Sequence, residues 1–152
     1  MSLPRSMAID TGPLILPITR ERGWEKIRKL LAFHERGELT LHVGLFNVVE
    51  LIYVMHRLGH DVRTTMEYAS LILDKLGIVR DDRYVLWMGK LRIEAYRHGY
   101  NIPWGDISSA ATALTLNIPV IVLDEDRHFN QIIVICRKLG KTIRIVRIKD
   151  LE

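Results

Sequence analysis

Acidic residues follow two of the apolar runs that this sequence offers as β-strands. Met7-Ala8-Ile9 leads into Asp10, and the run 120–123 leads into Asp124-Glu125-Asp126. Ligands of an open parallel sheet bind at the carboxyl ends of its strands. Either acidic position taken alone can be read as a turn or cap residue. Two such positions on one edge of one sheet are more informative, and they indicate a site there.

Two further carboxylates stand in predicted helices. Glu50 lies within a run of Val, Leu and Ile, in a helix that is apolar almost all round. A carboxylate there must be paired, protonated or bound to a cation, unless it reaches water at the helix margin. Asp106 is itself a good N-cap candidate, but the small residues after it suggest a helix packed closely on the sheet. Such a helix would point Asp106 toward Asp10.

Four segments can therefore deliver carboxylates to one place. Clustered carboxylates repel one another unless divalent cations lie between them, and oxygen ligands favour Mg²⁺ or Mn²⁺ over zinc. Two such ions about 3.5–4 Å apart can activate a water molecule and stabilise the leaving oxygen of a phosphodiester. The candidate metal ligands are Asp10, Glu50, Asp106, and one or both of Asp124 and Asp126.

The charge balance favours a polyanionic substrate. The chain has 152 residues, with 22 Lys and Arg against 18 Asp and Glu. Without the six acids of the four segments, the remainder carries a formal charge of +10, which suits a nucleic acid. Four aromatic residues could stack bases, although aromatic residues at helical spacing more often belong to a core: Tyr53, Tyr96, Tyr100 and Trp104.

The chain reads as one α/β domain over residues 1–152. Short β-branched runs predict strands over 7–11, 40–43, 119–123 and 142–146. Helical patterns cover 21–36, 45–58, 62–76, 82–98, 106–116 and 127–139. The pattern predicts a three-layer α/β/α fold with a parallel sheet of four or five strands, and a helical hairpin insertion in the middle. No apolar run reaches the roughly 20 residues that span a bilayer, so we expect a cytoplasmic protein that is not in the membrane.

These motifs, in this order, resemble the PIN-domain family, in particular the VapC-like toxins of prokaryotic toxin–antitoxin pairs. By this resemblance, Asp10, Glu50, Asp106 and Asp126 correspond to the family's acidic quartet. Thr11 corresponds to a hydroxyl residue that orders the first aspartate, and Asn47 stands near another usual hydroxyl position. Asp124 stands where many members have Ser or Thr, so either Asp124 or Asp126 can carry the fourth role. The matching segments are Ala8-Ile9-Asp10-Thr11, Asn47-Val48-Val49-Glu50-Leu51, 105–114 and 118–129.

The resemblance implies a Mg²⁺-dependent endoribonuclease, with Mn²⁺ as a substitute, that is often a homodimer and often silenced by an antitoxin protein. The expected mechanism is two-metal, water-activated hydrolysis of RNA that leaves a 5′-phosphate and a 3′-hydroxyl. Two alternatives stay open. One is an aspartyl-phosphate phosphatase that uses Asp124 and Asp126, with Asp124 as the nucleophile. The other is a non-catalytic RNA-binding module, which would gain nothing from clustered carboxylates.

Overall fold

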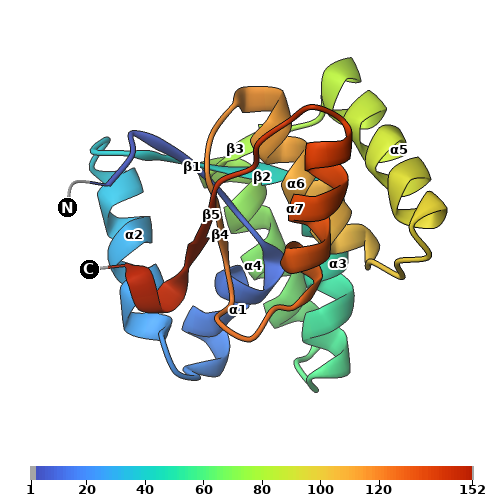
Figure 1. Cartoon of the computed structure of the whole chain (residues 1–152). Coiled ribbons are helices and arrows are strands. Elements are labelled where there is room, and N and C mark those ends of the chain that lie inside the picture. The colour runs from blue at the N-terminus through green and yellow to red at the C-terminus, as the bar shows by residue number, and fades with distance from the viewer. Residues whose placement is uncertain (1–2, 152) are drawn as a thin grey trace.

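A five-stranded, all-parallel sheet forms the centre of the molecule (Figure 1). The structure is a computed structural model and describes residues 3–151. The strand order is β3-β2-β1-β4-β5, so β1 lies in the middle of the sheet. The strands are β1 Ser6–Ile9, β2 Thr40–Gly44, β3 Gly77–Val79, β4 Val120–Val122 and β5 Ile145–Arg147. The parallel sheet expected from the sequence is thus confirmed.

Helices cover both faces of this sheet. Their bounds are α1 Thr11–Thr19, α2 Trp24–Glu35, α3 Leu45–Arg57, α4 Val62–Lys75, α5 Asp82–Arg97, α6 Trp104–Leu116 and α7 His128–Lys138. The buried apolar residues of α1 to α4 join one core, and those of α5 to α7 join a second. Within residues 3–151, no helix combines the length and the apolar character needed to cross a bilayer.

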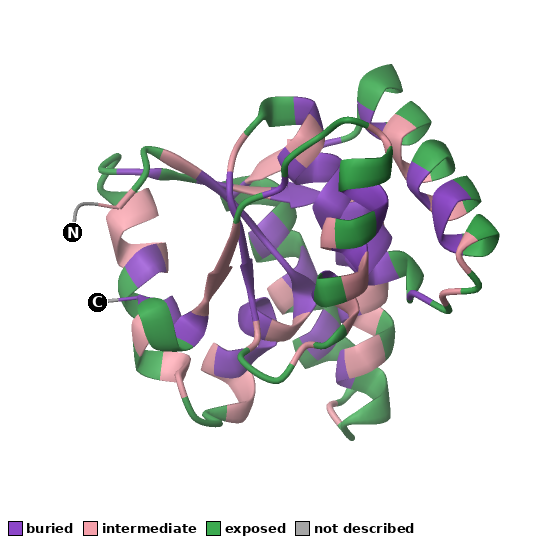
Figure 2. Cartoon of the chain, viewed as in Figure 1, coloured by how far each residue is buried: buried purple, intermediate pink, exposed green. Residues whose placement is uncertain are grey.

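The strands separate the two cores because successive strand residues point to opposite faces of a sheet. In β1, Met7 and Ile9 belong to the first core, whereas Ala8 belongs to the second. In β4, Ile121 belongs to the first core, and its two neighbours belong to the second. Figure 2 accordingly shows the largely buried strands β1 and β4 between helices whose outer faces are exposed. The expected three-layer α/β/α architecture is therefore confirmed.

Two elements differ from the sequence prediction. The first strand ends at Ile9, and the helix α1 begins at Thr11, within the residues that were expected to be strand. Pro17 lies inside α1. Because proline normally breaks a helix interior, this helix was not predicted from the sequence. The strand β3 was also missed, since it has three residues and follows α4 without a turn. Because β3 separates α4 from α5, the helical hairpin consists of α3 and α4 alone.

Candidate active site

Asp10 lies at the carboxyl end of the central strand. It is the residue between β1 and α1, and its side chain caps no helix N–H. The carboxylate is 4% exposed, and Oδ1 accepts a hydrogen bond from Ser109 Oγ at 2.5 Å. The backbone N–H of Asp10 donates to the carbonyl of Ile121 at 3.0 Å, which fixes Asp10 beside the end of β4. The sheet itself therefore positions this carboxylate.

Asp106 reaches the same edge from the first turn of α6. This helix packs closely on the sheet, because it presents small residues: a Cβ at Gly44 in β2 would lie 2.5 Å from Ser108 Oγ and 2.7 Å from Thr112 Oγ1. Asp106 itself is buried. The close helix that the small residues suggested is thus present, and its N-terminus brings Asp106 to the end of β1.

Asp126 comes from the loop that joins β4 to α7. Its Oδ1 accepts a hydrogen bond from the N–H of His128 at 2.9 Å, which holds the side chain at the start of α7. The guanidinium of Arg147, at the end of β5, donates to the carbonyls of Asp126 and Leu123 at 2.6 and 2.8 Å. Two strands thus fix the loop that carries Asp126.

The three carboxylates converge. One oxygen of each of Asp10, Asp106 and Asp126 lies within 4.8 Å of those of the other two, and we call these residues the acidic triad. Burial raises the pKa of Asp10 from its ordinary 3.8 to about 7, with a further rise from neighbouring carboxylates and an opposing effect of the hydrogen bond from Ser109. Burial raises the pKa of Asp106 to about 9, and the charges of nearby carboxylates act in the same direction.

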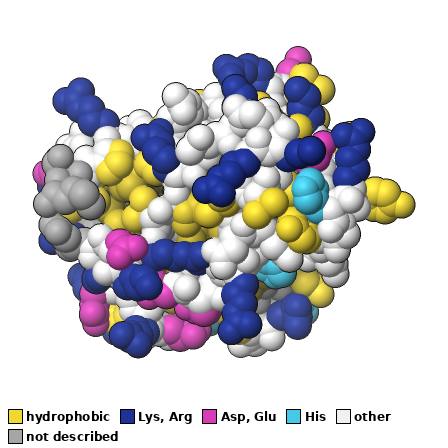
Figure 3. Space-filling view, in the orientation of Figure 1, with side chains coloured by type: hydrophobic (Ala, Val, Ile, Leu, Met, Phe, Trp, Pro, Cys, Tyr) yellow, Lys and Arg dark blue, Asp and Glu magenta, His cyan; other side chains and the backbone are white. Residues whose placement is uncertain are grey.

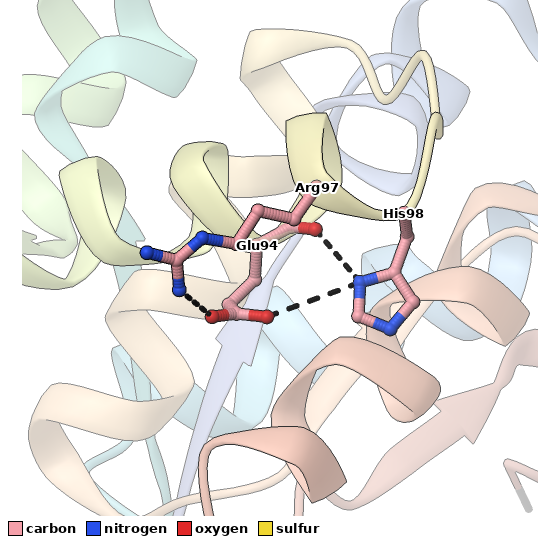
Figure 4. A network of polar contacts seen from close by, with 3 residues as sticks. All are labelled: Glu94, Arg97 and His98. Carbon is pink, nitrogen blue, oxygen red and sulfur yellow. Dashed lines mark hydrogen bonds and ion pairs between the residues drawn. The ribbon is translucent and has the colours of Figure 1, made fainter.

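The buried carboxylate of Glu94 has a cationic partner, in contrast to Asp10 and Asp106. Glu94, in α5, accepts a hydrogen bond from the Arg97 guanidinium at 2.8 Å, and Nδ1 of His98 lies 3.9 Å from its other oxygen (Figure 4). Among residues 3–151, neither Asp10 nor Asp106 forms an ion pair with a lysine or arginine. Buried carboxylates without a cationic side chain are either protonated or bound to a cation.

Glu50 lies next to the triad and outside it. The residue is half-buried in α3, and a Cβ added at Gly105 would overlap its carboxylate. The carboxylate therefore packs against the residue that precedes Asp106. Its charge contributes to the raised pKa of both Asp10 and Asp106. The glycine makes room for this approach.

Asp124 is not brought into the triad. It is exposed, and its Oδ1 accepts a hydrogen bond from the backbone N–H of Lys149 at 2.9 Å. Lys149 belongs to a short 3-10 helix, Ile148–Asp150, after β5. The expectation that Asp124 joins the metal ligands therefore finds no support in the geometry, because a contact with the C-terminal segment turns this side chain elsewhere.

Asn47 connects the elements around the triad. It is fully buried in α3, and its Nδ2 lies 2.9 Å from Thr11 Oγ1, 3.0 Å from the Gly105 carbonyl and 3.0 Å from Ser109 Oγ. Asp10 Oδ1 is also near, at 3.5 Å. The amide thus joins α1, α3 and α6. The hydroxyl of Thr11 contacts this amide, so Thr11 is tied to Asp10 through Asn47.

Three residues of this arrangement were not found from the sequence. Ser109 follows Asp106 by one helical turn, and that spacing was the available signal. Tyr84, in α5, accepts a hydrogen bond from the N–H of Phe46 at 3.2 Å and contacts Ser108 Oγ at 2.5 Å. It joins the starts of α3 and α6, but nothing in the local pattern of α5 indicates this. Arg147 contacts a loop 21 to 24 residues before it in the chain, and no local sequence pattern predicts that contact.

Comparison with known proteins gives a family and a fold. The model of the PIN domain matches residues 7–133, and the chain therefore belongs to the PIN-domain family. Its fold is similar to that of VapBC toxin–antitoxin structures. One is VapBC2 from Rickettsia felis, bound to a DNA fragment from its promoter, with 15% identity and a TM-score of 0.66 over 93% of this chain and 98% of that chain. The VapC-like resemblance is thus confirmed at the level of the fold.

Two more structures give the same result. DNA-bound VapBC from Salmonella typhimurium has 18% identity and a TM-score of 0.66, over 95% of this chain and 99% of that chain. VapBC-1 from nontypeable Haemophilus influenzae has 18% identity and a TM-score of 0.63, over 95% and 98%. Comparison with curated protein sequences gives no match.

Proposed function

We propose that this chain is a divalent-metal-dependent endoribonuclease, the toxin of a toxin–antitoxin pair, and that it works as a single nuclease domain. PIN domains are nucleases, which supports hydrolysis of a nucleic acid. The observation that carries the proposal is the acidic triad. Its three carboxylates come from separate elements and converge, and within residues 3–151 none of them forms an ion pair with a lysine or arginine.

The residues of the triad fit a divalent cation. All the donors are carboxylate oxygens, which suit Mg²⁺ or Mn²⁺ and do not suit zinc. The raised pKa values of Asp10 and Asp106 mean that the ionised carboxylates are disfavoured in the metal-free site, and a bound cation would stabilise them. Asp10, Asp106 and Asp126 would hold the metal, with Glu50 beside them. Asp124 hydrogen-bonds Lys149, and this contact favours neither a ligand role nor the phosphatase alternative.

Each residue has a definable part in this mechanism. A bound divalent cation supplies the Lewis acidity for phosphodiester hydrolysis. Ser109 and Asn47 orient the Asp10 carboxylate through hydrogen bonds to its Oδ1. His128 N–H fixes the Asp126 carboxylate in the same way. Glu50, whose charge acts on both Asp10 and Asp106, would accept a proton or hold a water molecule. The expected products are a 5′-phosphate and a 3′-hydroxyl.

Charge supports a nucleic acid as the substrate. The acids of the site stand in a chain whose net charge is +4, and Lys and Arg side chains are spread over the face shown in Figure 3. A net positive charge attracts a polyanion. RNA, rather than DNA, is our proposal for the substrate, and we place the protein in the cytoplasm.

A nuclease assay on metal-stripped protein tests the proposal. Wild-type protein should cleave single-stranded RNA when Mg²⁺ or Mn²⁺ is added and should stop when EDTA is added. Asp106→Asn should remove the activity, because it removes one charge from the triad, whereas Asp124→Asn serves as a matched control outside it. Undiminished cleavage in EDTA by metal-stripped protein would refute the metal-dependent mechanism.

We further propose two protein partners: a second copy of the chain and an antitoxin. The similar structures from Rickettsia felis and Salmonella typhimurium are VapBC complexes. Large apolar side chains are exposed on α3 and α5 and could form such contacts: Val49, Tyr53, Val85, Leu86 and Ile93. Light scattering on the purified protein tests the dimer. Co-expression with the product of the adjacent gene tests the antitoxin, which should co-purify and suppress cleavage.

A further inference from the structure

Trp104 is an exposed aromatic residue beside the acidic triad. It begins α6, only Gly105 separates it from Asp106, and 47% of its surface is exposed. Gly105 in turn contacts two groups of the site, through its carbonyl with the Asn47 amide and through its Cα with the Glu50 carboxylate. The indole therefore offers an accessible aromatic surface at the first residue of a helix.

Two neighbours hold the indole in place. The guanidinium carbon of Arg92, in α5, lies over the ring at 4.1 Å from its centroid, and its Nη2 donates to the carbonyl of Ile102 at 2.8 Å. Phe46, at the start of α3, contacts the indole at 6.4 Å between centroids with a tilt of 56°. The tilt leaves part of the indole open, as the exposed fraction shows. The Trp104 ring is thus held between Phe46 and the positively charged guanidinium of Arg92.

We propose that Trp104, backed by Arg92, is the platform on which a base of the RNA substrate stacks while the scissile phosphate lies at the acidic triad. This inference rests on the proposed nuclease function and adds a substrate contact to it. Every base has a π-face, so stacking holds single-stranded RNA without reading its sequence. Arg92 adds a cation where the backbone enters a pocket of negative charge.

Stacking on Trp104 would also offset the electrostatic repulsion between the acidic triad and RNA. Three carboxylates repel a polyanion, so the substrate must be held by other contacts until a metal neutralises the site. Stacking is such a contact, because it needs no charge on the RNA. Trp104 is therefore a binding residue, and its loss should weaken binding of RNA while the triad remains intact.

Binding to a cleavage-deficient background tests the platform. Asp106→Asn protein is titrated with a fluorescent single-stranded RNA of mixed sequence, and anisotropy is measured with and without Trp104→Leu. The additional substitution should weaken binding about 5- to 140-fold, the equivalent of the ~1–3 kcal/mol that one stacked base contributes. Trp104→Phe keeps an aromatic ring and should retain most of the affinity. Inorganic polyphosphate, which has charge and no bases, should bind both proteins equally.

Trp87→Leu is the matched control. Trp87 is a half-buried tryptophan of α5 and, like Trp104, has cationic side chains near its ring: Lys90 at 5.3 Å and Lys141 at 5.9 Å. Lys141 follows the C-terminal end of α7, whereas Asp126 precedes the N-terminal end, so Trp87 lies away from the triad. This variant should bind RNA as the Asp106→Asn protein does.

The outcomes separate this inference from the function on which it rests. If wild-type protein neither binds nor cleaves RNA, the nuclease proposal itself fails. If it cleaves RNA and Trp104→Leu binds and cleaves equally well, only the platform is refuted. Light scattering distinguishes RNA binding from a protein interface. A Trp104→Leu protein with normal RNA affinity and an altered oligomeric state would refute the platform and assign Trp104 to a protein interface. If Trp104→Leu does not fold, Trp104→Phe becomes the test variant. Because phenylalanine keeps an aromatic ring, a Trp104→Phe protein that binds RNA no more tightly than it binds polyphosphate would also refute the platform.

Discussion

Asp10→Asn should stabilise the metal-free protein while it abolishes cleavage. The asparagine keeps an acceptor for Ser109 Oγ, and it removes a buried carboxylate that lies beside Asp106 and Asp126. Burial raises the pKa of Asp10 from 3.8 to about 7. Ionised Asp10 therefore opposes folding at neutral pH by up to about 4 kcal/mol, because each tenfold change in proton affinity is worth about 1.4 kcal/mol. The gain in the variant cannot exceed this value.

The same pKa fixes how the effect depends on pH. A carboxyl group whose pKa is raised by folding binds its proton more tightly in the folded state, so its cost is greatest above pH 7. The cost declines as pH falls from 7 toward 3.8 and is absent below that range. The stability advantage of Asp10→Asn should thus be largest at pH 8 and fall below about 2 kcal/mol at pH 5.

Urea and thermal unfolding in EDTA measure this difference. In a chain of this size, 1 kcal/mol corresponds to about 2–4 °C in Tm. Mg²⁺ at 100 times its Kd should add about 2.7 kcal/mol to the wild type and clearly less to Asp10→Asn. Asp124→Asn is the control and should respond to Mg²⁺ as the wild type does. If Asp10→Asn is markedly destabilised in EDTA and Mg²⁺ shifts all three proteins equally, Asp10 is a structural residue and the site is wrongly assigned.

Further variants test the geometry of the site. Asp126→Asn should abolish RNA cleavage, whereas Asp124→Asn should retain it, since Asp124 contacts Lys149; the reverse order in a cleavage assay would reassign the ligand. Gly105→Ala should displace the Glu50 carboxylate and lower kcat about 10–100-fold without unfolding the protein, and an unchanged kcat would show that Glu50 has no part in catalysis. Asn47→Ala should cost about 1–3 kcal/mol in urea unfolding, because its amide joins three helices.

The sequence was most informative where a local pattern decides the structure. A β-branched run followed by Asp10 predicts a strand end, and parallel strands share one edge, so two carboxylates could be placed together before any contact was known. The run of small residues after Asp106 predicts a closely packed helix for an equally local reason. The family resemblance named the same residues.

Long-range contacts account for what the sequence did not predict. Asp124 and Asp126 are two residues apart in one loop, and no local rule decides which of them faces the triad. That choice depends on the contacts of Arg147 and Lys149, which come from the last residues of the structure. The strand β3 is likewise held by pairing with β2, because three residues carry too little pattern of their own.

The position of β1 in the sheet has a consequence for protein synthesis. This strand is synthesised before β2 and β3, yet one of its neighbours, β4, pairs Ile121 with Ile9 and is synthesised after them. Until then, Asp10 stands at an open edge, and the loop that carries Asp126 does not exist. Under the proposed ribonuclease function, this strand order leaves the acidic triad incomplete in the nascent chain until the loop after β4 has been synthesised. The nascent chain would therefore not cut its own message before that point.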